Sequence, residues 1–161
     1  MSKTQTAIFG MGCFWKPELL FSEIEGILST KVGYIGGDEE KYPNPTYEQV
    51  CSNETGYIES ILIEFNPKII SYEEILEIFW KNHNPTTANR QGPDIGTQYK
   101  SAIFYNSPNQ KKIAEKSKEE IQKKYEDKKV VTEIRKAETF FPAEDYHQKY
   151  LEKSGLKSCH I

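Results

Sequence analysis

Cys13 stands in the stretch FGMGCFWKPELLF, residues 9 to 21, with glycines just before it and two large aromatic residues directly behind it. An apolar, helix-like run follows, so we expect the thiol in the first turn of a helix. The unpaired N–H groups and the positive dipole end there favour the thiolate, which is the nucleophilic form of cysteine. The alternative is a buried structural thiol. Position alone leaves both interpretations open.

Glu59 is a carboxylate on the apolar face of an expected strand over residues 57–65. Because strand side chains alternate, it shares that face with Tyr57, Ile61, Ile63 and Phe65. If this part of the face is buried, desolvation raises the pKa of the carboxyl group and keeps it protonated near neutral pH. A neutral acid is a good proton donor. If this part of the face is exposed to solvent, Glu59 is only a surface residue.

The segment NRQGPDIGTQY, residues 89–99, is long for a structureless connection. Its length favours a binding role, and the alternative is a surface loop held by turns. Asp94 lies between two glycines, and Tyr99 closes the segment. No phosphate-cradling glycine motif is present.

Two further cysteines differ in their surroundings. Cys51 follows apolar Val50 and is interpreted as structural. Cys159 lies third from the end, where a mobile terminus can carry a thiol to another one; the alternative is an incidental exposed cysteine. No metal site is expected, because no recognised ligand spacing joins the cysteines to the histidines, His83, His147 and His160.

The totals limit the class of protein. The chain has 161 residues, 37% of them hydrophobic and 28% charged, which indicates one globular domain over residues 1–161. A net charge of −3 argues against a nucleic-acid or anionic-membrane surface. The sequence contains neither a membrane-length apolar run nor a signal-peptide core. With an odd number of cysteines, three, a cytoplasmic protein is expected.

The elements that must position these residues follow from periodicity and turn signals. Strands are expected over residues 6–10, 28–37, 57–65, 99–105 and 130–137. Helices are expected after residue 14, over 71–83, after Pro108 and over 142–153, and one helical turn is expected before residue 56. The first six main elements read strand, helix, strand, strand, helix, strand. This order predicts an α+β fold with a ferredoxin-like split β-α-β core (β-α-β-β-α-β), an extra helix and strand, and a C-terminal tail.

The residues also carry a resemblance to a known family. GCFW at residues 12–15 resembles the active-site signature of peptide methionine sulfoxide reductase A. The similarity continues through GGDEEKYPNPTYEQVCSNETGYIES, FWKNHNPTTANRQGPDIGTQYKSAIFY and FFPAEDYHQKYL, and it spans nearly the whole chain. The chain differs from the family in having Tyr57 for a histidine and Asn84 for an aspartate. Its tail also lacks the usual Asn-Pro and paired glycines.

The resemblance implies an oxidoreductase that reduces methionine S-sulfoxide, free or in proteins, and thereby repairs oxidative damage. Cys13 would attack the sulfoxide sulfur and be left as a sulfenic acid. Phe14 and Trp15 would line the pocket for the S-methyl group. Glu59 matches the acid that protonates or hydrogen-bonds the sulfoxide oxygen.

The same resemblance implies the remaining roles. Tyr47 and Tyr99 match two tyrosines whose hydroxyl groups help to hold the sulfoxide oxygen, and Asp94 matches an aspartate of the site. Cys159 resembles the resolving cysteine, which would form a disulfide with Cys13 that thioredoxin reduces. No metal or organic cofactor is implied.

Two other functions fit part of the pattern. A general thiol oxidoreductase or one-cysteine peroxidase needs Cys13 and a resolver, but it does not need Glu59. A methionine-recognition module would bind a thioether between Phe14 and Trp15 and would have no turnover to lose when Cys13 is replaced.

Overall fold

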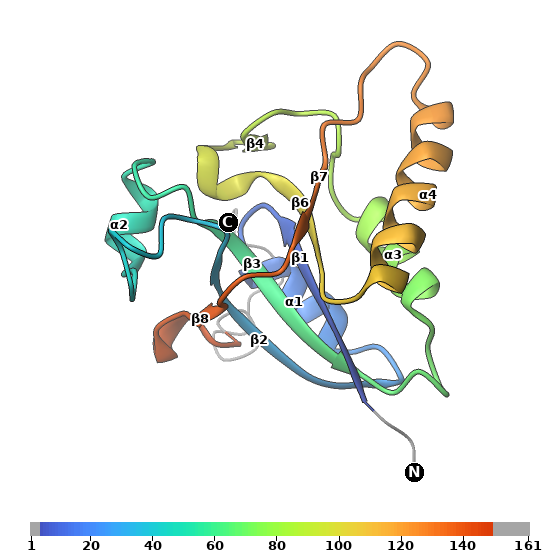
Figure 1. The fold of residues 1–161 in the computed structure, drawn as a ribbon, viewed down its shortest axis with the longest axis horizontal. Coiled ribbons are helices and arrows are strands. Elements are labelled where there is room, and N and C mark those ends of the chain that lie inside the picture. Colours follow the sequence, from blue (N-terminus) through green and yellow to red (C-terminus); the bar gives the residue numbers. More distant parts are fainter. Residues whose placement is uncertain (1–3, 150–161) are drawn as a thin grey trace.

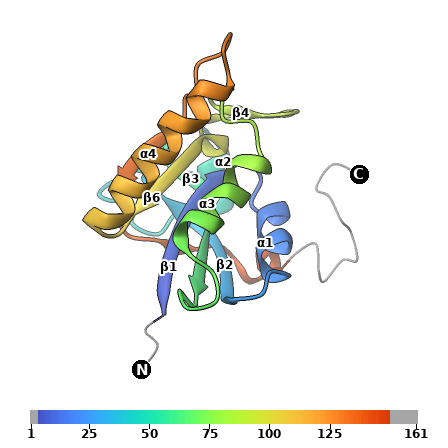
Figure 2. The same cartoon turned by 90° about the vertical axis from the view of Figure 1, so that its right-hand side faces the viewer.

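The computed structural model describes residues 4–149, which form a six-stranded sheet with helices on one face (Figures 1 and 2). The strands in the sheet, in spatial order, are β7 (Glu133–Lys136), β6 (Ser101–Tyr105), β1 (Gln5–Met11), β3 (Ile58–Phe65), β2 (Ile27–Ile35) and β8 (Phe141–Pro142). The helices are α1 (Trp15–Ser22), α2 (Tyr47–Cys51), α3 (Tyr72–Lys81) and α4 (Pro108–Lys124). A separate two-stranded sheet joins β4 (Arg90–Gln91) to β5 (Asp94–Ile95).

The main sheet is mostly antiparallel. Strand β1 lies between β3 and β6, and β2 lies between β3 and β8, with each of these pairs antiparallel. Only β6 and β7 run parallel within the described residues. This arrangement confirms the predicted α+β class.

Local signals start the helices where the sequence predicts. Ser71 caps α3 by accepting a hydrogen bond from the Glu74 backbone N–H at 3.1 Å, while the Glu74 side chain reaches back to Ser71. Ser107 caps α4 by accepting a hydrogen bond from the Gln110 backbone N–H at 3.1 Å, and Pro108 occupies the first helical position, where its missing N–H costs nothing. The predicted helical turn before residue 56 is α2.

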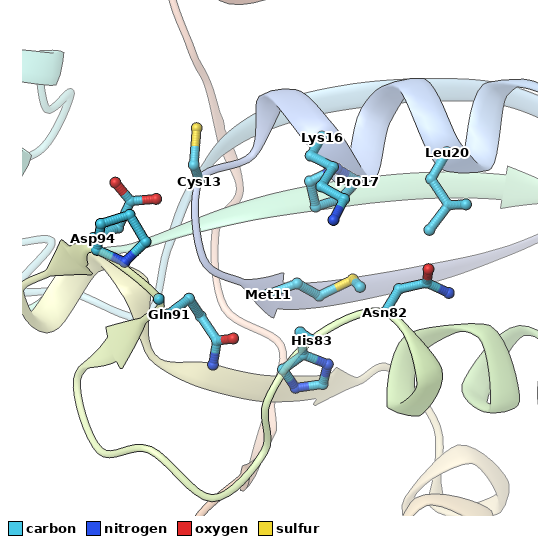
Figure 3. A pocket seen from close by; sticks show the side chains of 11 residues that line it. Met11, Cys13, Lys16, Pro17, Leu20, Asn82, His83, Gln91 and Asp94 are labelled. Carbon is cyan, nitrogen blue, oxygen red and sulfur yellow. The ribbon is translucent and has the colours of Figure 1, made fainter. Parts of the chain in front are cut away.

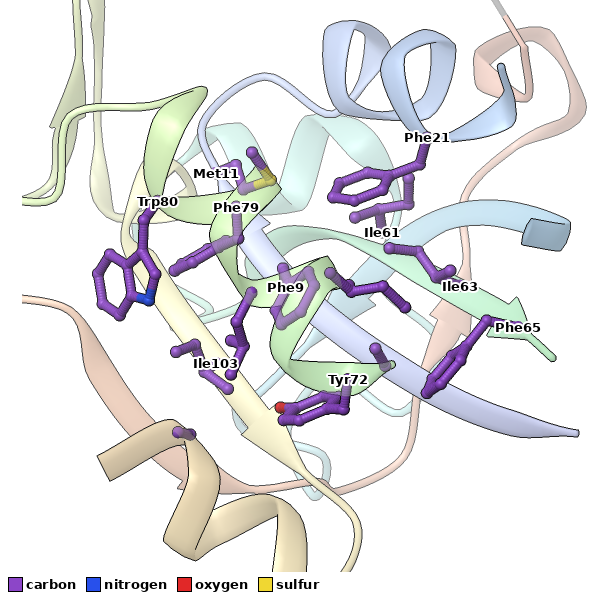
Figure 4. Close-up of a cluster of buried hydrophobic side chains, with 14 of the residues drawn as sticks. Phe9, Met11, Phe21, Ile61, Ile63, Phe65, Tyr72, Phe79, Trp80 and Ile103 are labelled. Atoms are coloured by element: carbon purple, nitrogen blue, oxygen red, sulfur yellow. The ribbon is translucent and has the colours of Figure 1, made fainter. Parts of the chain in front are cut away.

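A hydrophobic core joins the sheet to α1, α3 and α4 (Figure 4). Phe9 of β1 lies at its centre, with its ring centroid 4.8 Å from that of Phe79 on α3 and 6.2 Å from that of Phe21 on α1. All three side chains are fully buried. Burying such side chains stabilises the fold by about 2 kcal/mol each. Helix α1 is therefore held firmly against the sheet at the end of β1.

The predicted helix over residues 142–153 is wrong in its described part. The chain instead forms edge strand β8 and a single 3₁₀ turn over Asp145–His147. The Gln148 side chain accepts from the Val32 N–H at 3.0 Å and donates to the Val32 carbonyl at 2.9 Å. These bonds bind the segment to β2, so tertiary contacts override a local helical pattern.

The segment over residues 89–99 is also more ordered than a plain loop. It contains the β4–β5 hairpin, with Gly92 at φ +56° in its turn. Tyr99 ends a 3₁₀ turn that begins at Thr97, and the following strand starts two residues later than predicted, at Ser101. The reason is that the side chain of Asn53 accepts a hydrogen bond from the Thr97 N–H at 2.8 Å, which holds this turn against the end of α2.

Candidate active site

Cys13 lies in the tight turn between β1 and α1, two residues before the helix begins. Gly12 adopts φ +90°, and a Cβ atom there would lie 2.7 Å from the Cβ of Gln91, so this turn requires glycine. The core holds α1 behind it. The thiol is therefore fixed at the N-terminal end of a helix, where the dipole favours the thiolate, and it is partly exposed to a substrate.

Glu59 is buried beside this turn, with an exposed fraction of 1%. Its Oε1 atom accepts a hydrogen bond from the Phe14 backbone N–H at 3.4 Å, across 45 residues of sequence. The strand pattern is the expected one, because Glu59 shares its face with apolar residues that pack under the helices. Because Glu59 is buried, the alternative that it is only a surface residue is excluded. Its carboxyl group lies next to Cys13, the candidate nucleophile.

Tyr47 and Tyr99 come from separate elements and meet near this carboxyl group. Burial raises the pKa of both phenols, and Glu59 raises both further whenever its carboxyl group is ionised. Asp94 adds to the same effect on Tyr99. Both hydroxyl groups therefore stay protonated at neutral pH and act as hydrogen-bond donors.

The β4–β5 hairpin closes the other side of Cys13. A cavity of about 230 Å³ lies between this hairpin, the start of α1 and the end of α3. Figure 3 shows the Cys13 thiol and the Asp94 carboxylate at the same end of this cavity, away from Leu20. Gln91 fixes the hairpin by accepting from the Asn84 N–H at 2.9 Å and donating to its carbonyl. The predicted Asp94 position is thus next to the candidate nucleophile.

Aromatic rings form the wall behind the thiol. Phe14 is buried, with its ring centroid 5.8 Å from that of Tyr34, whereas Trp15 is partly exposed. The two residues differ in what they offer a ligand, because only Trp15 presents ring surface to solvent while Phe14 supports it from within. Together they make an apolar corner at the start of α1.

Sequence reasoning missed the residues that hold this corner, Glu144 and His147. The Glu144 carboxylate accepts from the Tyr34 hydroxyl at 2.9 Å and from the Tyr47 backbone N–H at 3.0 Å. His147 accepts a hydrogen bond from the Trp15 indole N–H at 3.0 Å. Both residues lie within the block PAEDYHQ that the resemblance includes, but its helix-like pattern concealed their contacts.

Cys51 is half-buried at the end of α2, and its thiol is hydrogen-bonded to Tyr47 and Gln98. Burial raises the pKa of this thiol, so it is mainly protonated at neutral pH. This environment supports the structural interpretation of Cys51. The predicted resolving residue, Cys159, lies outside the described residues.

The two departures from the family pattern are explained by local packing. Tyr57 is fully buried, and its hydroxyl group donates to the Tyr42 carbonyl at 2.7 Å, which ties down the loop before α2. Asn84 accepts a hydrogen bond from the Thr86 N–H at 2.9 Å. An amide oxygen is sufficient for this contact, so the turn before the hairpin does not need the aspartate charge.

Within residues 4–149 no three His, Cys, Asp or Glu side chains come together in a way that would hold a metal ion. None of the helices described is long and apolar enough to cross a membrane.

The chain is similar to known proteins in both sequence and fold. The sequence model of the family described as "Peptide methionine sulfoxide reductase" matches residues 5–161. A protein of Methanococcus maripaludis strain C6 named "Peptide methionine sulfoxide reductase MsrA" is 58% identical over 155 residues, which cover 96% of each chain. Reduced Mxr1 from Saccharomyces cerevisiae superimposes with a TM-score of 0.90 at 39% identity, covering 95% of this chain and 87% of Mxr1. Mxr1 in complex with Trx2 matches at a TM-score of 0.64 and 26% identity, covering 92% and 85%.

Proposed function

This chain belongs to the peptide methionine sulfoxide reductase family, and on that premise we propose that Cys13 and Glu59 carry its chemistry. The reaction is the thiol-dependent reduction of methionine sulfoxide to methionine, and thioredoxin recycles the enzyme. Because the sulfoxide sulfur is chiral, a site of one shape serves one epimer, and the family resemblance makes the S epimer the proposed substrate. The observation that carries the residue assignment is the buried Glu59 carboxyl group against the Phe14 N–H, next to Cys13.

The first step is attack of the Cys13 thiolate on the sulfoxide sulfur. The Cys13 sulfur bonds to the substrate sulfur, and the S–O bond breaks as its oxygen takes up one proton and passes as hydroxyl to the Cys13 sulfur. The S–S bond then breaks with its electron pair on the substrate sulfur, so methionine leaves reduced by two electrons and Cys13 is oxidised to a sulfenic acid. The turn at Gly12 aims the thiol outward, and the wall of Phe14 and Trp15 receives the S-methyl group.

The second requirement is a proton for the oxygen, which is a poor leaving group without one. Burial disfavours the charged form of a carboxyl group, so Glu59 is suited to deliver that proton. The Tyr47 and Tyr99 hydroxyl groups stay protonated and are suited to hold the oxygen while it is transferred. Asp94 lines the cavity that Cys13 also borders, and its charge acts on Tyr99.

The cycle ends with a disulfide. The Cys159 thiol is proposed to condense with the Cys13 sulfenic acid, which releases water and forms a Cys13–Cys159 bond that thioredoxin reduces by exchange. Burial, which raises the pKa of its thiol, disfavours Cys51 as the resolving thiol.

A count of products and thiols without added reductant tests these assignments. The chain has three cysteines. We expect one methionine per chain, with free thiols falling from three to one. Cys159→Ser should still release one methionine but lose only the Cys13 thiol, so its free thiols fall from two to one. Cys51→Ser should release one methionine and form the disulfide, so its free thiols fall from two to none. Loss of the disulfide in Cys51→Ser, with retention in Cys159→Ser, would overturn the choice of resolver.

We assign residues 1–161 to one domain with a ferredoxin-like core, which the spatial order β6-β1-β3-β2 and its antiparallel pairing support. The cytoplasm is the proposed location, because the chemistry requires Cys13 to be kept reduced between turnovers.

A further inference from the structure

Glu18 is a buried acidic residue that the proposed reaction does not use. It lies in the first turn of α1, and its exposed fraction is 1%. A carboxyl group at such depth needs hydrogen-bond partners. Its Oε2 atom accepts from the Thr30 hydroxyl group of β2 at 3.3 Å, and its Oε1 atom accepts from the backbone N–H of Lys149. One side chain thus joins the helix beside the nucleophile to β2 and to Lys149.

Lys149 has an unusual backbone conformation at this contact. Its φ is +56°, in the left-handed region that residues other than glycine rarely adopt. The residue before it, Gln148, is fixed separately, because its side chain forms hydrogen bonds with both backbone groups of Val32. The bond to Glu18 holds the N–H of Lys149 in place and so favours the left-handed conformation. The direction in which the chain continues past α1 depends on that conformation.

The sequence after Lys149 carries Cys159, the proposed resolving cysteine. It lies ten residues further on, so an extended chain of that length reaches at most about 35 Å. The Glu18 N–H donates at 3.3 Å to the carbonyl of Phe14, the residue that follows Cys13. The tether therefore starts against the first turn of the helix beside the nucleophile. A short tether that starts near its target raises the effective concentration of the group it carries.

We propose that Glu18 is a positioning residue for the second step of the reaction, because it fixes where and in which direction the chain that carries Cys159 leaves α1. The inference rests on the proposed role of Cys159. In that step the Cys159 sulfur bonds to the Cys13 sulfur, and the hydroxyl group of the sulfenic acid leaves with the thiol proton as water. Glu18 acts through Lys149, so its loss should slow formation of the disulfide and leave methionine release unchanged.

Two replacements of Lys149 test the contact without changing α1. Lys149→Pro removes the N–H donor and fixes φ at about −65°. Gln148 has φ −66° and ψ 120°, a conformation that a following proline allows. Lys149→Gly loses the same side chain, but it keeps the N–H and adopts a positive φ readily.

The assay follows methionine release and disulfide formation separately, after rapid mixing of the reduced enzyme with methionine S-sulfoxide. We expect the disulfide to form about five- to tenfold more slowly in Lys149→Pro and within about twofold of the unmodified rate in Lys149→Gly. Methionine release should have the same rate in both variants. Equal rates of disulfide formation in Lys149→Pro and Lys149→Gly would overturn the proposal.

Glu18→Ala removes the same bond from its other side. The matched control is Glu23→Ala, since Glu23 is exposed at the C-terminal end of the same helix. Disulfide formation should slow in Glu18→Ala as in Lys149→Pro, and the second change should add little to the first in a double-mutant cycle. Equal slowing of methionine release and disulfide formation would indicate a general support of α1 and would contradict the proposal. The Lys149 pair decides the question if Glu18→Ala does not fold.

The unmodified chain separates a failure of the inference from a failure of the proposed function. Methionine release without a Cys13–Cys159 disulfide would overturn the role of Cys159, and the inference with it. A disulfide that forms equally fast in the unmodified chain and in Lys149→Pro would leave that role intact and refute the role of Glu18. In the Cys159→Ser background, dithiothreitol reduces the sulfenic acid directly, so Lys149→Pro should not change turnover there; a loss would contradict the proposal.

Discussion

Replacement of Glu59 by glutamine changes one property of the site and leaves the others in place. Glutamine has nearly the same size as glutamate, and its amide oxygen can accept the Phe14 N–H, which lies 3.4 Å from Glu59 Oε1 in the unmodified chain. Glutamine has no acidic proton. The side chain is 1% exposed, so bulk water is a poor substitute as acid. Loss of a general acid slows a reaction by about 10²–10⁴-fold. Because Tyr47 and Tyr99 still donate hydrogen bonds, we expect a loss of about 10³-fold, or about 4 kcal/mol.

The assay is the rate of first methionine formation after rapid mixing of the reduced enzyme with methionine S-sulfoxide. Oxidation of Cys13 by hydrogen peroxide, measured in the same variant, should change little, because peroxide does not need this acid. Glu64→Gln is the matched control, since Glu64 lies on the same strand but on the opposite face. A loss of less than tenfold in Glu59→Gln, or an equal loss in Glu64→Gln, would refute the role of Glu59.

Three further changes test the walls and the support of the site. Trp15→Ala should lower kcat/KM by about 10–200-fold, mostly through KM, because the methyl group loses its apolar contact; an unchanged KM would contradict this. Gly12→Ala should abolish turnover, because the added Cβ atom would collide with Gln91 and displace the thiol. Gly92→Ala is the control, since Gly92 also has a positive φ but a Cβ atom there would meet no other atom, and it should keep most activity. Steady-state rates of the two variants are compared. Burial lowers the pKa of His83 to about 4 from 6.5, so the unfolded chain binds the proton first as pH falls. The free energy of unfolding should therefore decrease by up to about 3 kcal/mol between pH 6.5 and 4, and urea unfolding of His83→Gln should lose this dependence.

The parts of the site that local signals specify were predictable from the sequence. Alternation along residues 57–65 placed Glu59 on the apolar face, and the structure buries it there. The glycine directly before Cys13 is compatible with the turn found there, in which Gly12 adopts φ +90°. These features depend on neighbours within a few residues, and the periods of strands and turns describe such neighbours well.

The contacts that cross the fold were not predictable in the same way. The Trp15–His147 bond joins residues 132 apart, and no period in the sequence encodes it. The predicted helix over 142–153 had the right spacing of apolar residues, but the Gln148 side chain forms two hydrogen bonds with the backbone of Val32 instead. Local preference is weaker than several buried hydrogen bonds to a neighbouring strand, so the segment follows the sheet and delivers Glu144 and His147 to the site.

The central claim is that the sulfur of Cys13 is oxidised by methionine sulfoxide, and trapping of the product tests it most directly. Reduced Cys159→Ser enzyme is mixed with methionine S-sulfoxide and a dimedone-type reagent specific for sulfenic acids, and the labelled peptide is identified by mass spectrometry. We predict one label per chain, on Cys13, matched by one methionine released, and no label on Cys51. Methionine release without a label on Cys13, or release from Cys13→Ser, would contradict the account.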